Sequence, residues 1–365
     1  MKSPSPRKKL KLLNSARTHI ALGLSGGVDS ATSAALLLSE GYRVTGVTCV
    51  FHDDEASLAA VAAAEDVCRF LGIDHVVYEA QQAFDEVVVQ PFINDCCAGL
   101  TPSPCVTCNR FCKIPVLCQA ADDLGCEKIA TGHYARVVED LDTGRLTLKR
   151  ALDETKDQTY MLSLLTQEQL SRLVLPLGGF TKAEVRHYAE EQGIPVAHRP
   201  ESQDLCFIAG DYRDFLLDVG VQDDPGPIRT LDGVEVGTHE GLHRYTLGQR
   251  KGLGVALGEP QFVVDKDVED NAVIIAPKER AFISAFEVGD LNWMLAMPKA
   301  DETCTVKIRY RSAPVVARVE PLVDGRVRAV FNEPQSLTAP GQCCAFYQSN
   351  VLLGGGIIDK VVFSA

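Results

Sequence analysis

Hydrophobic positions in the first part of the chain follow two spacings, one typical of strands and one typical of helices. Short apolar or β-branched runs predict strands at residues 19–24, 43–51, 75–78 and 128–130. Longer stretches, each followed by a glycine that suits a helix end, predict helices at residues 31–40, 55–71, 113–124 and 181–192. Strands that alternate with helices favour an α/β fold, in which a parallel sheet is covered on both faces.

The pattern changes after about residue 215. An Asp-Asp-Pro-Gly-Pro cluster at residues 223–227 marks a turn, and short β-branched runs recur from residue 272 onward. This pattern predicts a small central β-rich domain followed by a C-terminal β-barrel. The expected divisions are a basic tail at residues 1–18, an N-terminal domain at 19–214, the central domain at 215–280 and the barrel at 281–365.

Composition indicates a globular protein of the cytoplasm. The chain has 365 residues, is 46% hydrophobic and 23% charged, and contains no apolar run of the ~18 residues that a membrane-spanning helix needs. Its 13 cysteines are too thinly spread for a disulfide scaffold and suit a reducing compartment. The net charge of −13 disfavours a polyanionic partner and, taken alone, favours a small substrate, although it leaves room for a local basic stripe.

A glycine-containing loop separates the first predicted strand from the first predicted helix. It reads Ser-Gly-Gly-Val-Asp-Ser over residues 25–30. Two glycines let the backbone bring its N–H groups close to an anion, and the start of the helix adds partial positive charge. The loop lacks the lysine of a G-x-x-x-x-G-K-[ST] phosphate loop, which reaches the β- and γ-phosphates. We therefore expect chemistry at the α-phosphate, which means adenylation with release of pyrophosphate.

Two regions hold cysteines suited to chemistry. Cys105 and Cys108 stand three residues apart beside prolines, and Cys206 lies alone among polar residues far downstream. A structural zinc site would need a second C-x-x-C pair, which the sequence does not contain. A redox dithiol and a thiol pair divided between two loops both remain open. Cys112 receives no role.

The order of several motifs resembles that of the bacterial tRNA-specific 2-thiouridylases, a family of ATP-dependent enzymes with this type of pyrophosphate loop. The motifs are the loop at residues 25–30, Thr-Pro-x-Pro-x-x-x-Cys-Asn at 101–109, Ala-Thr-Gly-His-Tyr-Ala at 130–135, Lys-Asp-Gln at 156–158, Glu-Ser-Gln-Asp-x-Cys-Phe-Ile at 201–208 and Tyr-Thr-Leu-Gly-Gln-Arg-Lys-Gly at 245–252. Shorter matches continue the series, so the resemblance covers the chain from about residue 19 to residue 358.

The resemblance implies an enzyme that replaces the C2 oxygen of the wobble uridine, U34, of tRNA by sulfur. ATP would adenylate that oxygen, and a cysteine persulfide would then deliver sulfur, with release of AMP and pyrophosphate. By position, Cys206 matches the persulfide-bearing cysteine, and Cys108 matches the nucleophile that would form a disulfide with it. Residues 19–214 would then be a Rossmann-like, ATP-binding catalytic domain of the adenine nucleotide alpha hydrolase-like kind.

The same residue-by-residue match implies further contacts. Those for ATP are Gly23, Leu24, Ser25, Gly26, Gly27, Val28, Asp29, Ser30, Cys49 and Gly132. Those for the target base are Ser103, Pro104 and Cys105. Those for tRNA are His133, Lys156, Asp157, Gln158, Arg309, Tyr310 and Gln342. The implied partners are the tRNA anticodon loop and a sulfur donor, either a cysteine desulfurase or a sulfur-relay protein; no membrane is expected to take part.

Mg²⁺ would accompany ATP, with Asp29, Asp53 and Asp54 as candidate ligands. The sequence departs from the family at Cys105, where some members carry Asp. A third thiol there makes an alternative conceivable, in which Cys105, Cys108 and Cys206 hold a [4Fe-4S] cluster. A small-molecule adenylating ligase of the same loop group is another alternative, and it would need neither paired cysteines nor RNA.

Overall fold

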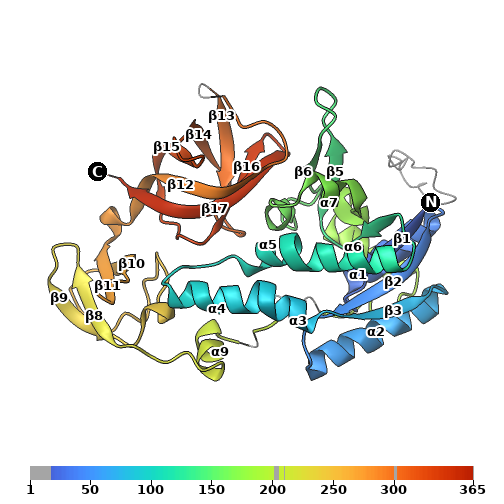
Figure 1. Cartoon of the computed structure of the whole chain (residues 1–365), viewed down its shortest axis with the longest axis horizontal. Helices are drawn as coiled ribbons and strands as arrows, with labels where there is room; N and C mark the ends of the chain where they lie inside the picture. The colour runs from blue at the N-terminus through green and yellow to red at the C-terminus, as the bar shows by residue number, and fades with distance from the viewer. Residues whose placement is uncertain (1–17, 201–204, 209, 300–301, 365) are drawn as a thin grey trace.

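The structure is a computed structural model that describes residues 18–200, 205–208, 210–299 and 302–364. The expected basic tail falls outside these residues apart from Thr18, and so does part of the motif that contains Cys206. Three bodies are visible in Figure 1: a helix-covered sheet at the N-terminal end, a small sheet and a C-terminal barrel. None of the helices in the described part of the chain combines the length and apolar character needed to cross a bilayer.

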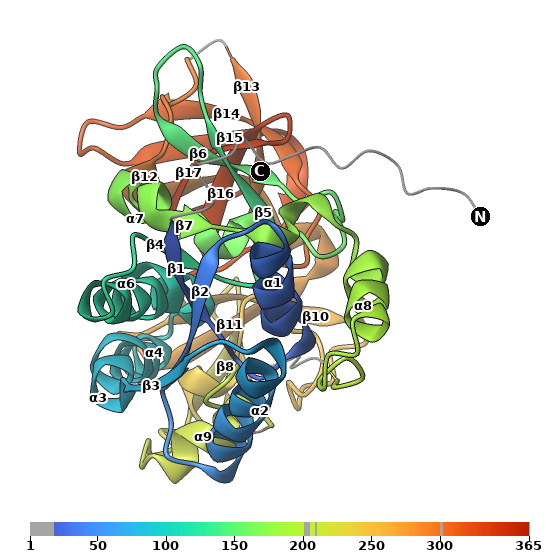
Figure 2. The ribbon, with the colours of Figure 1, turned by 90° about the vertical axis from the view of Figure 1, so that its right-hand side faces the viewer.

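The N-terminal body is built on a five-stranded parallel sheet, which confirms the predicted α/β class. In order across the sheet, its strands are β3 (His75–Glu79), β2 (Arg43–Val50), β1 (His19–Gly23), β4 (Lys128–Ala130) and β7 (Leu173–Val174). Residues of β1 alternate between two cores. Ile20 and Leu22 pack toward helices α1 and α2, whereas Ala21 packs toward α6, so helices cover both faces, as Figure 2 shows.

The helices of this body are α1 (Val28–Ser39), α2 (Glu55–Leu71), α3 (Gln81–Phe84), α4 (Gln90–Cys97), α5 (Pro104–Cys108), α6 (Ile114–Asp123), α7 (Gln167–Arg172) and α8 (Lys182–Glu191). Helix α2 has the predicted bounds, because Asp54 caps its start and Gly72 ends it in the left-handed conformation. Helix α1 begins three residues before the predicted start, so the last half of the glycine loop is already helical.

Two helical segments, one at residues 81–97 for which no helix is predicted and one that extends a predicted helix, share an irregularity. Helices α3 and α4 are joined by a π-helical turn at Asp85–Val89, and α5 and α6 by another at Asn109–Lys113. Each turn comes shortly before a proline, Pro91 or Pro115. A proline cannot donate the regular helical hydrogen bond, and a wider turn relieves the clash of its ring with the preceding turn. The helix predicted at residues 113–124 therefore continues a segment that begins at Pro104.

The rest of the chain forms β-structure, as predicted. After α9 (Tyr212–Asp218), the small sheet has the order β10-β11-β8-β9. Its strands are β8 (Gly226–Thr230), β9 (Glu235–His239), β10 (Gln261–Asp267) and β11 (Ala272–Pro277). The barrel strands are β12 (Phe282–Trp293), β13 (Thr303–Lys307), β14 (Val315–Pro321), β15 (Val327–Ser336), β16 (Cys343–Gln348) and β17 (Val351–Phe363). They pair in the order β12-β15-β14-β13-β16-β17, and antiparallel pairing of β12 with β17 closes the barrel.

A hairpin from the N-terminal body extends the barrel sheet. It consists of β5 (Ala135–Glu139) and β6 (Leu146–Arg150), and Lys149 of β6 pairs with Val351 of β17. The hydroxyl of Thr147 also donates a hydrogen bond to the carbonyl of Leu352. One hydrophobic core therefore contains residues of both bodies, among them Leu148 and Tyr347.

Candidate functional site

The glycine loop between β1 and α1 is fixed by its own backbone and by one arginine. Gly26 has φ +68°, and a Cβ there would lie 2.6 Å from the carbonyl oxygen of Ala60, so only glycine fits without displacing its neighbours. Arg199 donates from Nη1 to the Gly26 carbonyl at 2.9 Å. The Ser25 N–H donates to Ser30 Oγ at 3.2 Å. Because no side chain caps α1 at Gly27, its first N–H groups are available to an anion.

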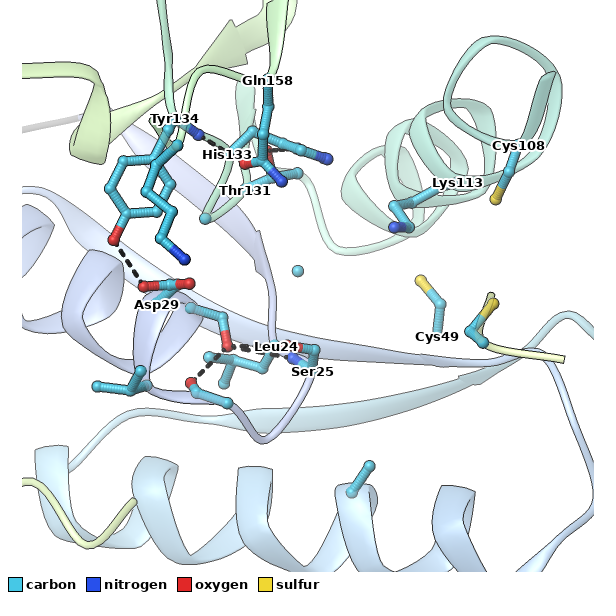
Figure 3. Close-up of a pocket in the computed structure, with 18 of the residues that line it drawn as sticks. Leu24, Ser25, Asp29, Cys49, Cys108, Lys113, Thr131, His133, Tyr134 and Gln158 are labelled. Carbon is cyan, nitrogen blue, oxygen red and sulfur yellow. Dashed lines mark hydrogen bonds between the residues drawn. The ribbon is translucent and has the colours of Figure 1, made fainter. Parts of the chain in front are cut away.

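The segment after β4 closes against this loop. A Cβ on Gly132 would lie 3.0 Å from the backbone nitrogen of Ser30, which explains why glycine stands there. On the adjoining side, Oδ1 of Asp29 accepts hydrogen bonds from Lys182 Nζ at 2.6 Å and from the Tyr134 hydroxyl at 2.8 Å. Figure 3 shows Asp29 beneath Tyr134, with Thr131 and His133 nearby. The Asp29 carboxylate is thus oriented and charge-balanced by the protein.

A second wall of the site comes from the helical segment that carries Cys108. Cys108 is 6% exposed, and Lys113 follows it at the end of the π-helical turn; both face the open space in Figure 3. A hydrogen bond from the Cys112 thiol, and after it the positive charge of Lys113, lower the pKa of Cys108 although burial opposes them. The same bond raises the pKa of Cys112, which remains the protonated donor.

Lys113 is surrounded by sulfur. Burial alone would lower its pKa, but four neighbouring sulfur groups outweigh that effect and raise it. These groups belong to Cys108, Cys206, Cys105 and Cys49. Lys113 therefore keeps its charge at neutral pH and favours a thiolate on the sulfur that most easily ionises, which is Cys108.

The segment that contains Cys206 is anchored by its next residue. The ring of Phe207 lies edge-on to Phe92 at 5.3 Å, to Phe215 at 5.5 Å and to Phe84 at 5.8 Å between centroids. This packing holds Cys206 at the pocket that Cys108 also lines. Desolvation of the Cys206 thiol by the surrounding protein raises its pKa to about 11, against the opposing charge of Lys113, although the residue as a whole is exposed, so Cys206 and Cys108 differ in their ionisation. All thirteen thiols of the chain are free.

A cavity of about 1170 Å³ joins the glycine loop to these cysteines. It brings together most of the predicted site residues: Gly23, Leu24, Ser25, Gly27, Val28, Asp29, Ser30, Cys49, Cys108, Gly132, His133, Lys156, Asp157, Gln158, Cys206 and Tyr310. The barrel supplies its outer rim, with Lys307 and residues 310–314. These predicted residues thus line one cavity that neither body forms alone.

A smaller cavity of about 160 Å³ adjoins the first and shares Tyr310 with it. Its lining includes Ser103, Pro104 and Cys105, which are the predicted target-base residues, and Gln342. Gly26 and Arg309 line neither cavity. The predicted site residues are therefore divided between the large cavity, which contains the glycine loop, and the small cavity, which adjoins it at Tyr310.

Several residues predicted to contact tRNA have partners within the protein. Asp157 is buried and accepts hydrogen bonds from the Ala151 N–H at 3.1 Å and the Thr159 hydroxyl at 2.8 Å. The Arg309 guanidinium donates to the carbonyl of Leu337 at 2.9 Å. These contacts give both side chains a structural role, while their contact with RNA stays a prediction.

Two further tRNA candidates are also held in place. The Gln158 side chain accepts a hydrogen bond from the Tyr134 N–H at 2.9 Å. His133 Nδ1 lies 2.8 Å from the Thr131 hydroxyl. Burial, and after it the charge of Lys113, lower the pKa of His133 to about 3, so it is neutral at physiological pH. His133 can therefore take part in hydrogen bonds but offers no positive charge to a phosphate.

Four residues that line or support the cavity are absent from the predicted site residues: Lys113, Lys182, Arg199 and Tyr134, the last of which stands within one of the motifs. Lys113 carried a usable signal, because it lies five positions after Cys108 in a predicted helical region. Lys182 carried none, since 153 positions separate it from Asp29. Only the fold brings that pair together.

Metal ligands are not grouped in the described residues. Within them, no three His, Cys, Asp or Glu side chains are arranged to hold a metal ion. Of the acids considered for Mg²⁺, Asp29 is bonded to Lys182, and Asp54 accepts the Ser57 N–H at 2.7 Å as the cap of α2.

Comparison with known proteins covers nearly the whole chain. Family models described as the tRNA methyl transferase HUP domain, the tRNA methyl transferase PRC-barrel domain and the aminomethyltransferase beta-barrel domain match residues 18–210, 213–277 and 283–358. The chain is 45% identical over 354 residues to the tRNA-specific 2-thiouridylase MnmA of Chloroflexus aurantiacus, which covers 94% of this chain and 98% of that protein. It is 44% identical over 355 residues to the MnmA of Heliobacterium modesticaldum, covering 93% and 92% of the two chains.

Proposed function

The chain belongs to the tRNA-specific 2-thiouridylase family, and on that premise we propose that it performs ATP-dependent 2-thiolation of the wobble uridine, U34, of tRNA. It is a tRNA-uridine 2-sulfurtransferase that adenylates the C2 oxygen and then replaces it by sulfur from a cysteine persulfide, releasing AMP and pyrophosphate. One observation carries the assignment of residues: the glycine loop and two cysteines from separate segments face a single cavity.

The glycine loop is the end of the cavity that receives ATP. The uncapped N–H groups at the start of α1 suit the phosphates, and the fixed turn at Gly26 keeps those groups aligned. Mg²⁺ bound with the nucleotide would neutralise phosphate charge. Since Asp29 is bonded to Lys182 and Asp54 caps a helix, the ATP phosphates and water, rather than these two carboxylates, would supply most of the ligands of this ion.

Sulfur transfer takes place at the opposite end of the cavity, which Cys108 and Cys206 line. The terminal sulfur of a persulfide on Cys206 attacks C2, and AMP leaves with the electrons of the C2–O bond. The Cys108 thiolate attacks Sγ of Cys206, which breaks the bond between Cys206 and the transferred sulfur and leaves a Cys108–Cys206 disulfide. An external thiol then reduces this disulfide. The lowered pKa of Cys108 supports its role as the attacking thiolate.

The smaller cavity suits the target base. A uridine must leave the anticodon stack to reach the cysteines, and half-buried Tyr310 offers a ring at the junction of the two cavities. Lys156, Lys307 and Arg311 at the rim provide local positive charge on a chain of net charge −13. Because Cys206 is exposed, a sulfur donor of the cysteine desulfurase or relay type can reach it.

The iron–sulfur alternative has less support. Cys105, Cys108 and Cys206 all lie near Lys113, but in the described part of the chain no three side chains are arranged as ligands around one metal position, which a [4Fe-4S] cluster would require. Iron and sulfide analysis of anaerobically purified protein tests this choice: stoichiometric iron that is needed for activity would favour the cluster over the persulfide.

Mass spectrometry of tRNA nucleosides tests the function itself. Cells that carry only Cys206→Ser are expected to lose 2-thiouridine at the wobble position, because no persulfide can form. Cys97→Ser is the matched control, since Cys97 is also exposed but lies on α4 outside both cavities. Wobble 2-thiouridine that persists in the Cys206→Ser cells would refute the assignment, and so would its absence from cells with the wild-type protein.

A further inference from the structure

The C-terminal barrel forms hydrogen bonds with the loop at residues 101–103, which leads into α5. The contact is made by residues 340–343, which lead into and include the first residue of β16 and which we name the barrel clamp. The side-chain amide of Gln342 donates hydrogen bonds to the carbonyl oxygens of Thr101 at 2.7 Å and of Pro102 at 3.3 Å. In the opposite direction, the Thr101 N–H donates to the carbonyl of Pro340 at 2.9 Å.

The remaining residues of the barrel clamp fit the same loop closely. The Cys343 N–H donates to Oγ of Ser103 at 3.0 Å. Gly341 has φ +88°, and a Cβ there would lie 3.1 Å from both Leu100 Cβ and the Thr101 nitrogen. Each of the four positions therefore meets the loop, through a hydrogen bond or through a close approach that only glycine permits.

The 101–103 loop lies directly before the proposed target-base and cysteine residues. It runs into Pro104 and Cys105 at the start of α5, and the same helical segment carries Cys108. The barrel clamp is also bonded to the N-terminal body, because the buried hydroxyl of Tyr160 donates to the Cys343 carbonyl at 2.8 Å. Any shift of the barrel clamp would thus be transmitted to the lining of the small cavity.

We propose that Gln342 is a positioning residue, which acts from the barrel to hold the 101–103 loop so that residues 103–105 line the small cavity and Cys108 faces the large one. The inference rests on the proposed function, but it gives Gln342 a different role from the RNA contact that family resemblance implies. One amide that donates to two consecutive carbonyls fixes the orientation of the peptide between them. This role operates before any tRNA arrives.

Backbone hydrogen exchange without tRNA or ATP tests the proposal on the full chain. In Gln342→Ala and in Gln342→Glu, which cannot donate to carbonyls, exchange across residues 100–106 is expected to rise roughly fivefold to tenfold, as loss of one or two hydrogen bonds permits. Gln348→Ala is the matched control, since Gln348 is exposed at the end of β16 in the same barrel, and it should leave exchange unchanged.

Kinetics supply the second readout. With tRNA as the varied substrate, the two Gln342 variants are expected to lower kcat severalfold with little change in KM. Unchanged exchange across residues 100–106 overturns the proposal, and a raised KM in that case assigns Gln342 to RNA binding. Should both Gln342 variants fail to fold, Ser103→Ala removes one hydrogen bond of the barrel clamp from the loop side, and faster exchange across residues 100–106 is then required. Hydrogen exchange is measured without any reaction. Wild-type protein that makes no 2-thiouridine would therefore contradict the proposed function but not the positioning role of Gln342.

Discussion

The two ends of the large cavity are held in place by different physical means. At the nucleotide end, hydrogen bonds among neighbouring loop residues and a glycine in the left-handed region fix the backbone within a few positions of sequence, and a single distant residue, Arg199, adds one hydrogen bond to the turn. At the sulfur end, Cys108 and Cys206 come from distant segments, which aromatic packing and the charge of Lys113 bring into one environment. Local backbone geometry thus prepares the first half-reaction, and long-range packing prepares the second.

The largest effect is expected at Gly26. In Gly26→Ala the new Cβ would lie 2.6 Å from the Ala60 carbonyl oxygen, so the loop must shift, and ATP-dependent thiolation should fall by at least about a hundredfold. Gly72→Ala is the matched control, because Gly72 has the same φ of +68° but no atom within 4 Å of a Cβ. Both variants should lose about 1 kcal/mol of stability from backbone strain. Equal thiolation rates in the two would show that the loop tolerates displacement.

An intermediate effect is expected at Lys113. In Lys113→Gln the positive charge disappears and the pKa of Cys108 rises from about 6 toward that of an ordinary thiol. The thiolate fraction at pH 7 should then fall from about nine-tenths to about one half or less. Alkylation of Cys108 by iodoacetamide, followed by mass spectrometry across pH 5 to 10, should show its midpoint displaced to higher pH. Lys128→Gln changes a lysine of β4 outside both cavities and should leave the profile intact. An unshifted midpoint in Lys113→Gln would mean that the Cys112 hydrogen bond alone activates Cys108.

The smallest effect is expected at Phe207. Phe207→Leu removes the edge-on ring contacts with Phe84, Phe92 and Phe215, at a cost of about 1 kcal/mol, and loosens the placement of Cys206. Release of AMP and formation of the Cys108–Cys206 disulfide during one turnover should both slow a few-fold, because both follow attack by the Cys206 persulfide, while pyrophosphate formation stays unchanged.

The control for this variant is Phe111→Leu, because Phe111 is 53% exposed and lies on the same helical segment as Cys108. Slower adenylation in Phe207→Leu would break the comparison, since it would show that the sulfur end also shapes the nucleotide end.

This division also explains what the sequence could reveal. The glycine loop, α2 and the parallel strands follow from spacing and capping residues within short windows, and the structure confirms them. Pro115 obscured the joined helices on which Cys108 lies, because a π-helical turn before a proline has no signature in hydrophobic spacing. Residues that act through distant partners, such as Lys182 with Asp29, depend on the folded arrangement. Family resemblance supplied the residue roles that spacing could not.

The β5–β6 hairpin limits how this protein can be taken apart. Since the hairpin continues the barrel sheet through Lys149 and Val351, cutting the chain before residue 281 would expose the edge of β6 and uncover apolar side chains that both bodies share. The N-terminal body is therefore not expected to fold as an independent domain, although it contains the glycine loop, Cys105, Cys108 and Cys206. A chimaera that takes its barrel from a relative must therefore also take the β5–β6 hairpin from that relative, so the two bodies can only be exchanged together with the segment that joins them.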